Sequence, residues 1–228
     1  MLKKWEDLPP FMKCDEVKIY YNALARKRTQ ILIKRCLDYV MAVLLLILFS
    51  VPMLMIAVAV SIDSKGPAIF HQTRVTSYGK RFVIHKFRTM NETSQDILSL
   101  TAEQDERITR VGAFLRKTRL DELPQLYDIL AGYMSFVGAR PEVPEFVSQY
   151  TKEMYASLLL PAGLTSSASI RFRDEARLFN KVEGTERCRI YVEKILPEKM
   201  KDNLNDILRF SVFRDLKILI RTALCFIE

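Results

Sequence analysis

A long run of uncharged residues limits what this chain can fold into. From Val40 to Ile62, 23 consecutive residues include no Asp, Glu, Lys or Arg. A helix of that length can cross a hydrocarbon layer about 30 Å thick. The run therefore predicts a membrane-associated helix near the beginning of the chain.

The charges on either side of this run argue against a simple crossing. Nine Lys or Arg residues precede it, and Lys34 and Arg35 are the closest of them. The residues that follow are also basic, at Lys65, Arg74, Lys80, Arg81, Lys86 and Arg88. Basic flanks favour the cytoplasmic side of a membrane, so the pattern assigns both ends to the cytoplasm. One straight crossing cannot satisfy both assignments.

A proline in the middle of the run offers a solution. Pro52 frees a backbone carbonyl and kinks a helix, and the hydroxyl of Ser50 can bond the backbone nearby. We therefore predict a re-entrant helix that enters the membrane, bends and returns to the same side. The alternative is an ordinary bitopic anchor with a proline kink.

Composition points to a folded domain with anionic partners. The chain has 228 residues, 49% hydrophobic and 27% charged, which is enough for one domain with a core. Its net charge of +8 suits nucleic acid, an anionic lipid surface or a nucleotide-linked substrate. We predict no nucleic-acid partner, because no reading motif accompanies the charge and the apolar run argues against one. The four cysteines lack metal-ligand spacing and are expected to be reduced, and two histidines are too few for a zinc site.

Several later segments have a pattern that predicts secondary structure. Two strands are expected at Ala68–Arg74 and Arg81–Met90, joined by a turn. Alternation places four side chains on one face of the second strand, so that two cations can reach the same anion: Phe82, Ile84, Lys86 and Arg88. Residues 161–165 read as a turn and 168–173 as a strand. From 207 to 227 the spacing of apolar residues predicts a basic amphipathic helix, which suits a core or a membrane surface.

The stretch from Arg107 to Pro141 has the composition of a site for phosphate chemistry. Asp121 and Glu122 follow five closely spaced cations: Arg107, Arg110, Arg116, Lys117 and Arg119. Pro124 suits the first turn of a helix, so residues 124–131 are predicted to be helical, with both carboxylates just before the helix and favoured in their ionised form. Adjacent residues point in different directions, which favours two roles over one shared proton. Thr109 is expected to cap the preceding helix.

A simpler interpretation stands beside this one. Asp and Glu before a helix are ordinary capping residues, and an Arg-rich helix is ordinarily a solvated face. Spacing alone favours that interpretation.

The order of residues in this stretch favours the phosphate site over ordinary capping residues. Residues 114–126 read Phe-Leu-Arg-Lys-Thr-Arg-Leu-Asp-Glu-Leu-Pro-Gln-Leu, and residues 134–141 read Met-Ser-Phe-Val-Gly-Ala-Arg-Pro. Together they closely resemble the signature of bacterial sugar transferases, the monotopic polyprenol-phosphate phosphoglycosyl transferases. Further blocks resemble the family in the same order, at residues 34–38, 66–67, 72–74, 86–90, 161–165 and 195–200. The resemblance covers about residues 34–222 and favours the exopolysaccharide-type members.

Four positions depart from the family pattern. Val51 separates Ser50 from Pro52, which are adjacent in the family. Ala139 stands where the family has the first proline of Gly-Pro-Arg-Pro. Tyr133 replaces an acidic residue, and Ser166 replaces a glycine.

The resemblance implies a fold and an organisation. It implies a mixed α/β, mostly helical, monotopic membrane protein with an N-terminal re-entrant helix and interfacial amphipathic helices. Residues 1–33 would form an interfacial lead-in, residues 34–63 the re-entrant helix, and residues 64–228 a cytosolic catalytic domain with a membrane-apposed C-terminal helix. Ser50 and Pro52 would form the bend. The oligomeric state is left open, with a homodimer as one option.

The resemblance also implies an activity. A sugar 1-phosphate would move from a nucleotide-diphosphate sugar, by family a UDP-sugar, to undecaprenyl or another polyprenyl phosphate. This is the first membrane step of glycoconjugate or exopolysaccharide assembly, at the cytoplasmic face of the bacterial inner membrane. The alternative is a basic membrane-surface scaffold without enzymatic activity, which gives no reason for two carboxylates amid ordered cations.

The same resemblance assigns roles to residues. Asp121 would be the nucleophile that forms a covalent aspartyl-phosphosugar, and it would also contact Mg²⁺. Glu122 would orient or deprotonate the acceptor. The remaining substrate contacts would come from Lys86, Arg88, Arg107, Arg116, Gln125, Arg140 and Arg171.

Overall fold

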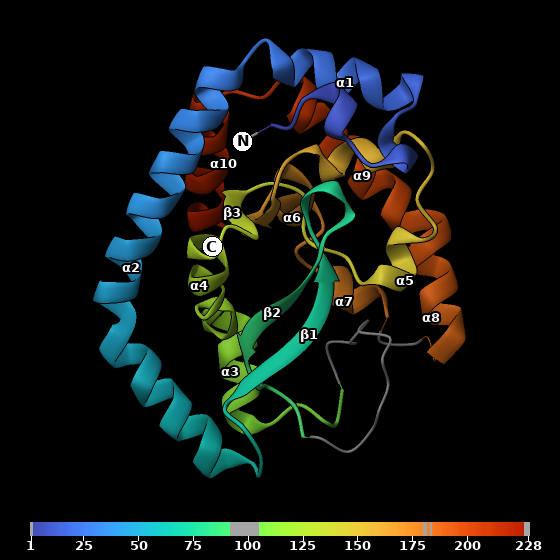
Figure 1. Ribbon diagram of the computed structural model, residues 1–228. Coiled ribbons are helices and arrows are strands. Elements are labelled where there is room, and N and C mark those ends of the chain that lie inside the picture. Colours follow the sequence, from blue (N-terminus) through green and yellow to red (C-terminus); the bar gives the residue numbers. More distant parts are fainter. Residues whose placement is uncertain (1, 92–104, 180–181, 183, 226–228) are drawn as a thin grey trace.

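The computed structural model describes residues 2–91, 105–179, 182 and 184–225. Helices dominate this part of the chain, and two small sheets lie among them (Figure 1), which confirms the expected mixed and mostly helical class. The helices are α1 Asp15–Ala25, α2 Arg28–Asp63, α3 Arg110–Thr118, α4 Gln125–Leu130, α5 Pro144–Val147, α6 Ser167–Arg171, α7 Glu175–Leu178, α8 Gly184–Ile190, α9 Leu196–Leu208 and α10 Val212–Leu224. The strands are β1 Ile69–Val75, β2 Arg81–Phe87, β3 Met134–Val137 and β4 Ala162–Thr165.

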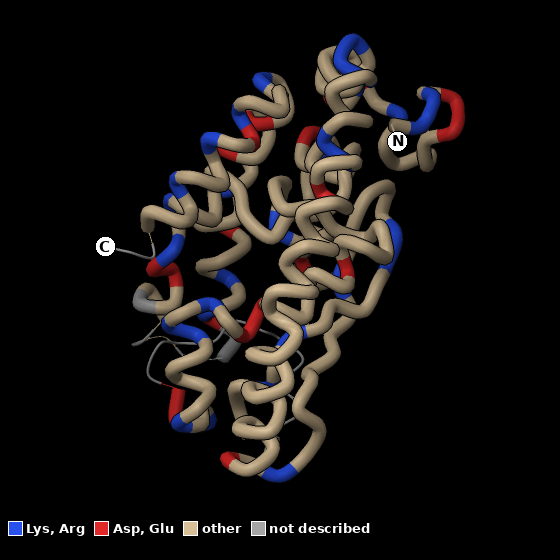
Figure 2. Tube along the Cα trace, turned by 90° about the vertical axis from the view of Figure 1, so that its left-hand side faces the viewer, with Lys and Arg blue, Asp and Glu red and all other residues tan. Residues whose placement is uncertain are grey.

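The uncharged run forms the central part of α2. Among the described residues this is the one helix long and apolar enough to cross a membrane. Figure 1 shows that it changes direction near its middle, and Pro52 lies inside it. The Ser50 hydroxyl donates to the Ile47 carbonyl at 2.8 Å, as the sequence suggested. Figure 2 shows a long stretch without charge on this side of the molecule. Its exposed apolar side chains include Val43, Leu44, Ile47, Leu48, Val51, Leu54, Met55 and Val58.

The N-terminal half of α2 is fixed to the folded domain by buried charges. Lys34 pairs with Asp215 of α10 at 2.7 Å. Asp38 accepts hydrogen bonds from the Ser135 hydroxyl at 2.8 Å and from the Phe136 backbone N–H at 3.3 Å. Because Lys34 and Asp38 are both buried, losing either partner would leave a charge without compensation.

The other end of α2 is fixed to the same domain. Asp63 accepts a hydrogen bond from the backbone N–H of Val111 at 3.0 Å, at the start of α3. Ser64, just after the helix, accepts from Arg88 through its carbonyl at 2.7 Å and its hydroxyl at 3.0 Å. One folded body therefore holds both ends of the apolar helix.

The first sheet is an antiparallel hairpin of β1 and β2, in which His71 lies opposite His85. Both predicted strands are present, although β2 ends at Phe87 and not at Met90. The buried side chains of Phe82 and Ile84 belong to the same apolar cluster as residues of α4 and β3. The hairpin is therefore packed beside the segment that carries the two candidate carboxylates.

The second sheet pairs β3 with β4 in parallel, with Met134 opposite Ala162 and Val137 opposite Thr165. The turn predicted at residues 161–165 is therefore wrong, because β4 occupies most of it. Two glycines, Gly138 and Gly163, allow the backbones of these two segments to approach closely. A Cβ on Gly163 would lie 2.2 Å from the backbone N and O of Gly138.

The strand predicted at residues 168–173 is also wrong, because α6 occupies most of this segment. The Ser166 hydroxyl accepts a hydrogen bond from the Ser169 backbone N–H at 3.1 Å and caps the helix. Asp206 of α9 accepts from the backbone N–H of Ser167 at 3.1 Å. These two contacts satisfy backbone N–H groups that have no partner within the helix at its start. Alternation over only six residues is a weak indication of a strand, and these capping contacts favour the helix.

The N-terminal residues contribute to the main core. Met12, Val17 and Leu24 are fully buried and share an apolar cluster with residues of α5, α9 and the segment between them. The Tyr20 hydroxyl donates to Glu153 at 2.6 Å. Residues 2–25 therefore pack against the domain that was expected to begin at residue 64, and they are more than a lead-in lying on a surface.

The continuous helix predicted from Ile207 to Ile227 is divided in two. The first helix, α9, ends at Leu208, and the second, α10, starts at Val212 after a cap in which Ser211 accepts from the Arg214 N–H at 3.1 Å. The last three residues of the chain lie outside the described part. The second helix exposes a row of apolar residues: Phe213, Leu216, Ile220 and Leu224. The four cysteines are free, as expected.

The glycine crossing gives a stability prediction. Gly163→Ala should destabilise the fold by about 1–3 kcal/mol, because the added Cβ would overlap backbone atoms that have no room to move. Urea unfolding of the detergent-solubilised protein measures the loss. Ala131→Ser, which adds one atom at an exposed position, is the control and should stay within about 0.5 kcal/mol. Equal stability of the two variants would contradict the prediction.

Candidate active site

A sharp turn in the chain presents the two candidate carboxylates. The cap predicted for α3 is confirmed, since the Thr109 side chain accepts from the Gly112 N–H at 3.0 Å. After α3, Arg119 adopts a left-handed conformation with φ of 57°, and a 3₁₀ turn from Leu120 to Glu122 follows. Pro124 then forms the N-cap of α4, so the predicted short helix is present and begins one residue later.

Glu122 is the centre of a cluster of cations. Its side chain is 9% exposed. Arg140 approaches it with two nitrogens, at 2.5 and 3.4 Å, and Lys86 lies at 3.4 Å. Arg119 is the third cation, at 3.9 Å. Burial alone would raise the pKa of Glu122, but the charges of Arg140 and Lys86 outweigh it and hold that pKa well below its usual value.

Asp121 has a different environment. It is buried, and its Oδ1 atom has no hydrogen-bond partner among the described residues. Burial, followed by the negative charge of Glu122, raises the pKa of Asp121 above its usual value. The sequence predicted that the helix start favours the ionised form of both carboxylates, and the surroundings in the fold act in that direction on Glu122 and in the opposite direction on Asp121. Glu122 is surrounded by cations, whereas the Oδ1 atom of Asp121 has no hydrogen-bond partner among the described residues.

A second side chain without partners lies one turn further on. Gln125 is fully buried, and neither atom of its amide has a hydrogen-bond partner among the described residues. Buried polar groups are normally hydrogen-bonded, so each exception calls for an explanation. Asp121 and Gln125, four residues apart in the chain, are therefore the two residues of this segment with buried oxygens that have no hydrogen-bond partner among the described residues.

An unpartnered carboxylate oxygen such as that of Asp121 is a donor of the kind that suits a magnesium ion. Mg²⁺ is usually held by one or two carboxylates, with water and substrate phosphates completing its coordination. In the described part of the chain, no group of three or more His, Cys, Asp or Glu side chains could hold a metal. The donors that are present, Asp121 and the Gln125 amide oxygen, therefore suit an ion that binds together with a phosphorylated substrate.

Three of the predicted cations differ in their surroundings. Burial, followed by the charge of Arg140, lowers the pKa of Lys86 to about 8. Burial also lowers the pKa of Arg116, while the charge of Asp121 opposes that shift. Arg107 makes a two-point contact with Asp105, at 2.9 and 2.7 Å.

The structure does not bring the other two predicted cations to Glu122. Arg88 is 3% exposed and donates to Ser64, because β2 ends at Phe87 and the alternation of the strand no longer applies. Lys86 and Arg88 therefore have different partners within the described residues, while the Nε and Nη1 atoms of Arg88 have no hydrogen-bond partner there. Their contact with one substrate anion stays a prediction. Arg171 lies at 3.3 Å from Asp202 and 3.5 Å from Glu198, both on α9.

The sequence did not assign a role to the residues that support the loop after Arg140. Arg74 donates to the carbonyl of Pro141 at 3.1 Å, and the buried Glu142 accepts from the Tyr191 hydroxyl at 2.5 Å. The block at residues 72–74 gave a signal for Arg74. Tyr191 lies 49 residues beyond its partner, and the sequence offers no signal for that contact.

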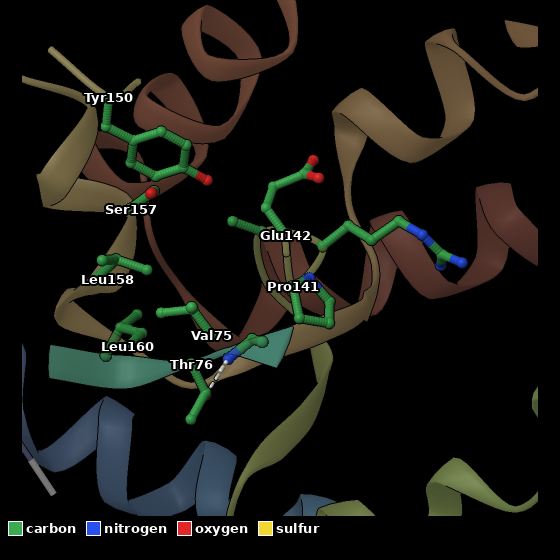
Figure 3. Close-up of a pocket in the computed structure, with 11 residues that line it drawn as sticks. Val75, Thr76, Pro141, Glu142, Tyr150, Ser157, Leu158 and Leu160 are labelled. Atoms are coloured by element: carbon green, nitrogen blue, oxygen red, sulfur yellow. Dashed lines mark hydrogen bonds between the residues drawn. The ribbon is translucent and has the colours of Figure 1, made fainter. Parts of the chain in front are cut away.

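A small pocket lies beside the same loop. Figure 3 shows Glu142, Tyr150 and Ser157 among the residues that line it. Thr76 also lines it and accepts a hydrogen bond from the Ala162 backbone N–H at 3.1 Å. About 10 Å³ is open to the centre of a water molecule, which is room for one water. The pocket is too small for a nucleotide sugar, so the substrate is not placed there.

Comparison with known proteins shows the family of this chain. The family model described as bacterial sugar transferase matches residues 29–228. The chain belongs to this family. Residues 1–28, which contribute α1 to the core, lie before the matched region.

Curated relatives cover most of the chain. The chain is 36% identical over 197 residues to an Escherichia coli protein named UDP-glucose:undecaprenyl-phosphate glucose-1-phosphate transferase, covering 84% of this chain and 39% of the relative. A Caulobacter vibrioides protein of the same name is 38% identical over 83% of this chain and 68% of its own length. An Aeromonas hydrophila UDP-N-acetylgalactosamine-undecaprenyl-phosphate N-acetylgalactosaminephosphotransferase is 41% identical over 60% of this chain and 34% of its own length. The chain therefore spans little more than a third of two of these relatives.

The Glu122 cluster gives a second stability prediction. Glu122→Gln should lower the free energy of unfolding by about 2 kcal/mol or more, because Lys86 and Arg140 would lose the charge that compensates them. Arg140 is 33% exposed, so water reduces the loss below that of a fully buried pair. Urea unfolding measures the difference, and Glu145→Gln at an exposed position is the matched control. Unfolding midpoints that agree for both variants would show that Glu122 does not hold the cluster together.

Proposed function

We propose that this chain is a phosphoglycosyl transferase that moves a sugar 1-phosphate from a UDP-sugar to undecaprenyl phosphate through a covalent intermediate on Asp121. The observation that carries the proposal is the contrast between two adjacent buried carboxylates. Glu122 is fully engaged with cations, and Asp121 keeps one oxygen without a partner. Family membership and the names of the relatives support the substrate classes, and those names include two different sugars, so the sugar is left open.

The proposed reaction has two displacements. An Oδ atom of Asp121 attacks the phosphorus that bears the sugar, and the bond from that phosphorus to the bridging oxygen breaks. Nucleoside monophosphate leaves with the bonding electrons. A phosphate oxygen of the lipid then attacks the same phosphorus, and Asp121 departs as a carboxylate. Covalent catalysis of this kind divides one difficult transfer into two easier steps.

The cations around the carboxylates would stabilise the phosphoryl group in both steps. Lys86 and Arg140 lie against Glu122, and Arg116 is close enough to Asp121 for their charges to interact. Fixed positive charges of this kind neutralise the oxygens of a transferring phosphoryl group. A Mg²⁺ ion held by Asp121 and Gln125 would add Lewis-acid stabilisation of the leaving phosphate. Arg88, Arg107 and Arg171 stay predictions as substrate contacts.

Glu122 has a supporting role in this proposal. A lipid phosphate is already ionised at neutral pH, so the acceptor has little need of a general base. Three cations occupy the carboxylate of Glu122, and its pKa is held low, so it is a poor proton acceptor. We assign it to holding Lys86 and Arg140 in place.

The attachment of α2 supports a re-entrant course at the cytoplasmic face of the inner membrane. Lys34 and Asp38 bind the folded domain near one end, and Asp63 binds it at the other. A helix that crossed the membrane would separate these two ends by the whole bilayer. A bend at Pro52 leaves both ends on one side and agrees with the basic flanks. A homodimer stays a prediction that one chain does not test.

The covalent step is tested by omitting the lipid. Purified protein given a UDP-sugar and Mg²⁺ should release up to one equivalent of UMP and gain the mass of one phosphosugar, which undecaprenyl phosphate should then remove. Asp121→Asn should abolish both adduct and turnover, because an amide is a poor nucleophile toward phosphorus. The control is Asp7→Asn, which makes the same change at an exposed residue far from Asp121 in the sequence.

A different outcome separates the alternatives. If UMP appears only after lipid is added, and no adduct forms in an active preparation, the reaction is a direct displacement and not a covalent one. If Asp121→Asn retains full activity, Asp121 has no part in the reaction. A wild-type protein that binds membranes and turns over none of a panel of UDP-sugars would favour the scaffold.

Cysteine labelling tests the course of α2. In a variant with all four native cysteines replaced by serine, single cysteines at Asn22 and Ser148 change no charge on either flank. A membrane-impermeant maleimide should label neither in intact cells and both in inverted membrane vesicles. Labelling of one site and not the other in intact cells would show that α2 spans the membrane. Pro52→Leu should shift the pattern toward spanning, because it restores a straight helix.

A further inference from the structure

The free edge of β2 is bound by a single buried carboxylate. Within the described part of the chain β2 pairs with β1 alone, so its other edge is left without a strand. Asp128 of α4 covers that edge. Its Oδ2 atom accepts from the backbone N–H of His85 at 3.0 Å, and its Oδ1 atom lies 2.7 Å from the ring Nδ1 of the same residue. Asp128 is fully buried.

Neighbouring rings restrict the imidazole of His85. The ring of His71, directly opposite on β1, packs edge-on with its centroid at 5.1 Å. The ring of Tyr127 packs edge-on from α4 at 5.7 Å. The His85 ring therefore stays where Asp128 holds it, and two bonds join one strand residue to one helix residue.

The position of this contact connects it to the candidate active site. His85 is followed by Lys86, whose ammonium lies 3.4 Å from Glu122. Asp128 lies one turn after Gln125, on the helix that directly follows Asp121 and Glu122. The two bonds thus join the strand that carries Lys86 to the helix that follows the carboxylates.

The contact with Asp128 adds to the apolar packing between β2 and α4. Phe82 and Ile84 share a core cluster with Leu126 and Ile129, which holds β2 against α4. A slip by one residue would turn Phe82 and Ile84 out of the core, so this packing and the pairing with β1 set which face of β2 is turned inward. The two bonds to Asp128 add directional contacts at the residue next to Lys86, and they fix the distance between β2 and α4 at that point.

We propose that His85 and Asp128 form a positioning pair that fixes Lys86 against Glu122 and so completes the cationic side of the active site. This inference rests on the proposed transferase function. Neither residue touches the reacting atoms, and both act through Lys86.

A double-mutant cycle tests the pair. Lys86→Ala and Asp128→Ala should each lower kcat/KM by about tenfold or more, as expected for loss of a charge-assisted phosphate contact. The double variant should lie within about twofold of Lys86→Ala, because a positioning residue has nothing left to position once Lys86 is gone. Both single variants should also divide their loss between kcat and KM in the same way. If the fold-losses of kcat/KM in the two single variants multiply in the double variant, Asp128 acts independently of Lys86 and the proposal is overturned.

A conservative variant separates positioning from charge. Asp128→Asn keeps an oxygen for the His85 N–H and offers an amide N–H to Nδ1, so it should stay within about threefold of wild type. His85→Ala keeps the backbone bond and removes the ring bond, so it tests the pair if Asp128→Ala fails to fold. Its effect should be smaller than that of Lys86→Ala and should disappear in the Lys86→Ala background. A His85→Ala effect that persists there would contradict the proposal.

A matched control uses another carboxylate that binds a backbone N–H. Asp63 accepts from Val111 at 3.0 Å and has no bond to β2 among the described residues. Any effect of Asp63→Ala on kcat/KM should therefore multiply with that of Lys86→Ala. A wild type without turnover would overturn the transferase proposal and this inference with it. An active wild type with multiplicative Asp128 and Lys86 effects would overturn the positioning role alone.

Discussion

The rest of the site depends on stabilising the buried negative charge of Glu122. An ionised carboxylate removed from water is costly unless cations surround it. The cations come from three parts of the chain that are distant in sequence: Lys86 from β2, Arg119 from the turn after α3, and Arg140 from the loop after β3. Folding around Glu122 therefore gathers these segments and leaves Asp121, its neighbour in the chain, at their meeting point. Burial, followed by the charge of Glu122, raises the pKa of Asp121.

Local signals in the sequence predicted the local parts of this fold. The uncharged run and Pro52 predicted a long bent helix, Thr109 predicted a helix cap, and Pro124 predicted the start of α4. Each of these depends on residues within a turn or two of one another. The motif around Asp121 also identified the family, because its order of residues is longer than any single spacing rule.

The features that the sequence missed depend on contacts between distant residues. The parallel pairing of β3 with β4 requires Gly138 and Gly163 to meet, and neither glycine signals its partner. Strand alternation was predicted to continue to Met90, but β2 ends at Phe87, before Arg88. The segment at residues 168–173 became a helix because Asp206, more than thirty residues away, binds its first N–H group. Burial of Met12 and Val17 likewise depends on partners more than a hundred residues later, so a charged N-terminal segment looked like a surface element.

The two attachments of α2 have a mechanical consequence. A transmembrane helix that is free at its ends adapts to a thicker or thinner bilayer by tilting as a rigid rod. This helix is fastened to one folded body through Lys34 at one end and Asp63 at the other, so it cannot tilt without moving that body. Within a bilayer, a change in thickness would instead open or close the angle at Pro52. On the proposed re-entrant course, the flexible point of α2 would therefore lie in its middle, away from the residues that attach its ends to the folded domain.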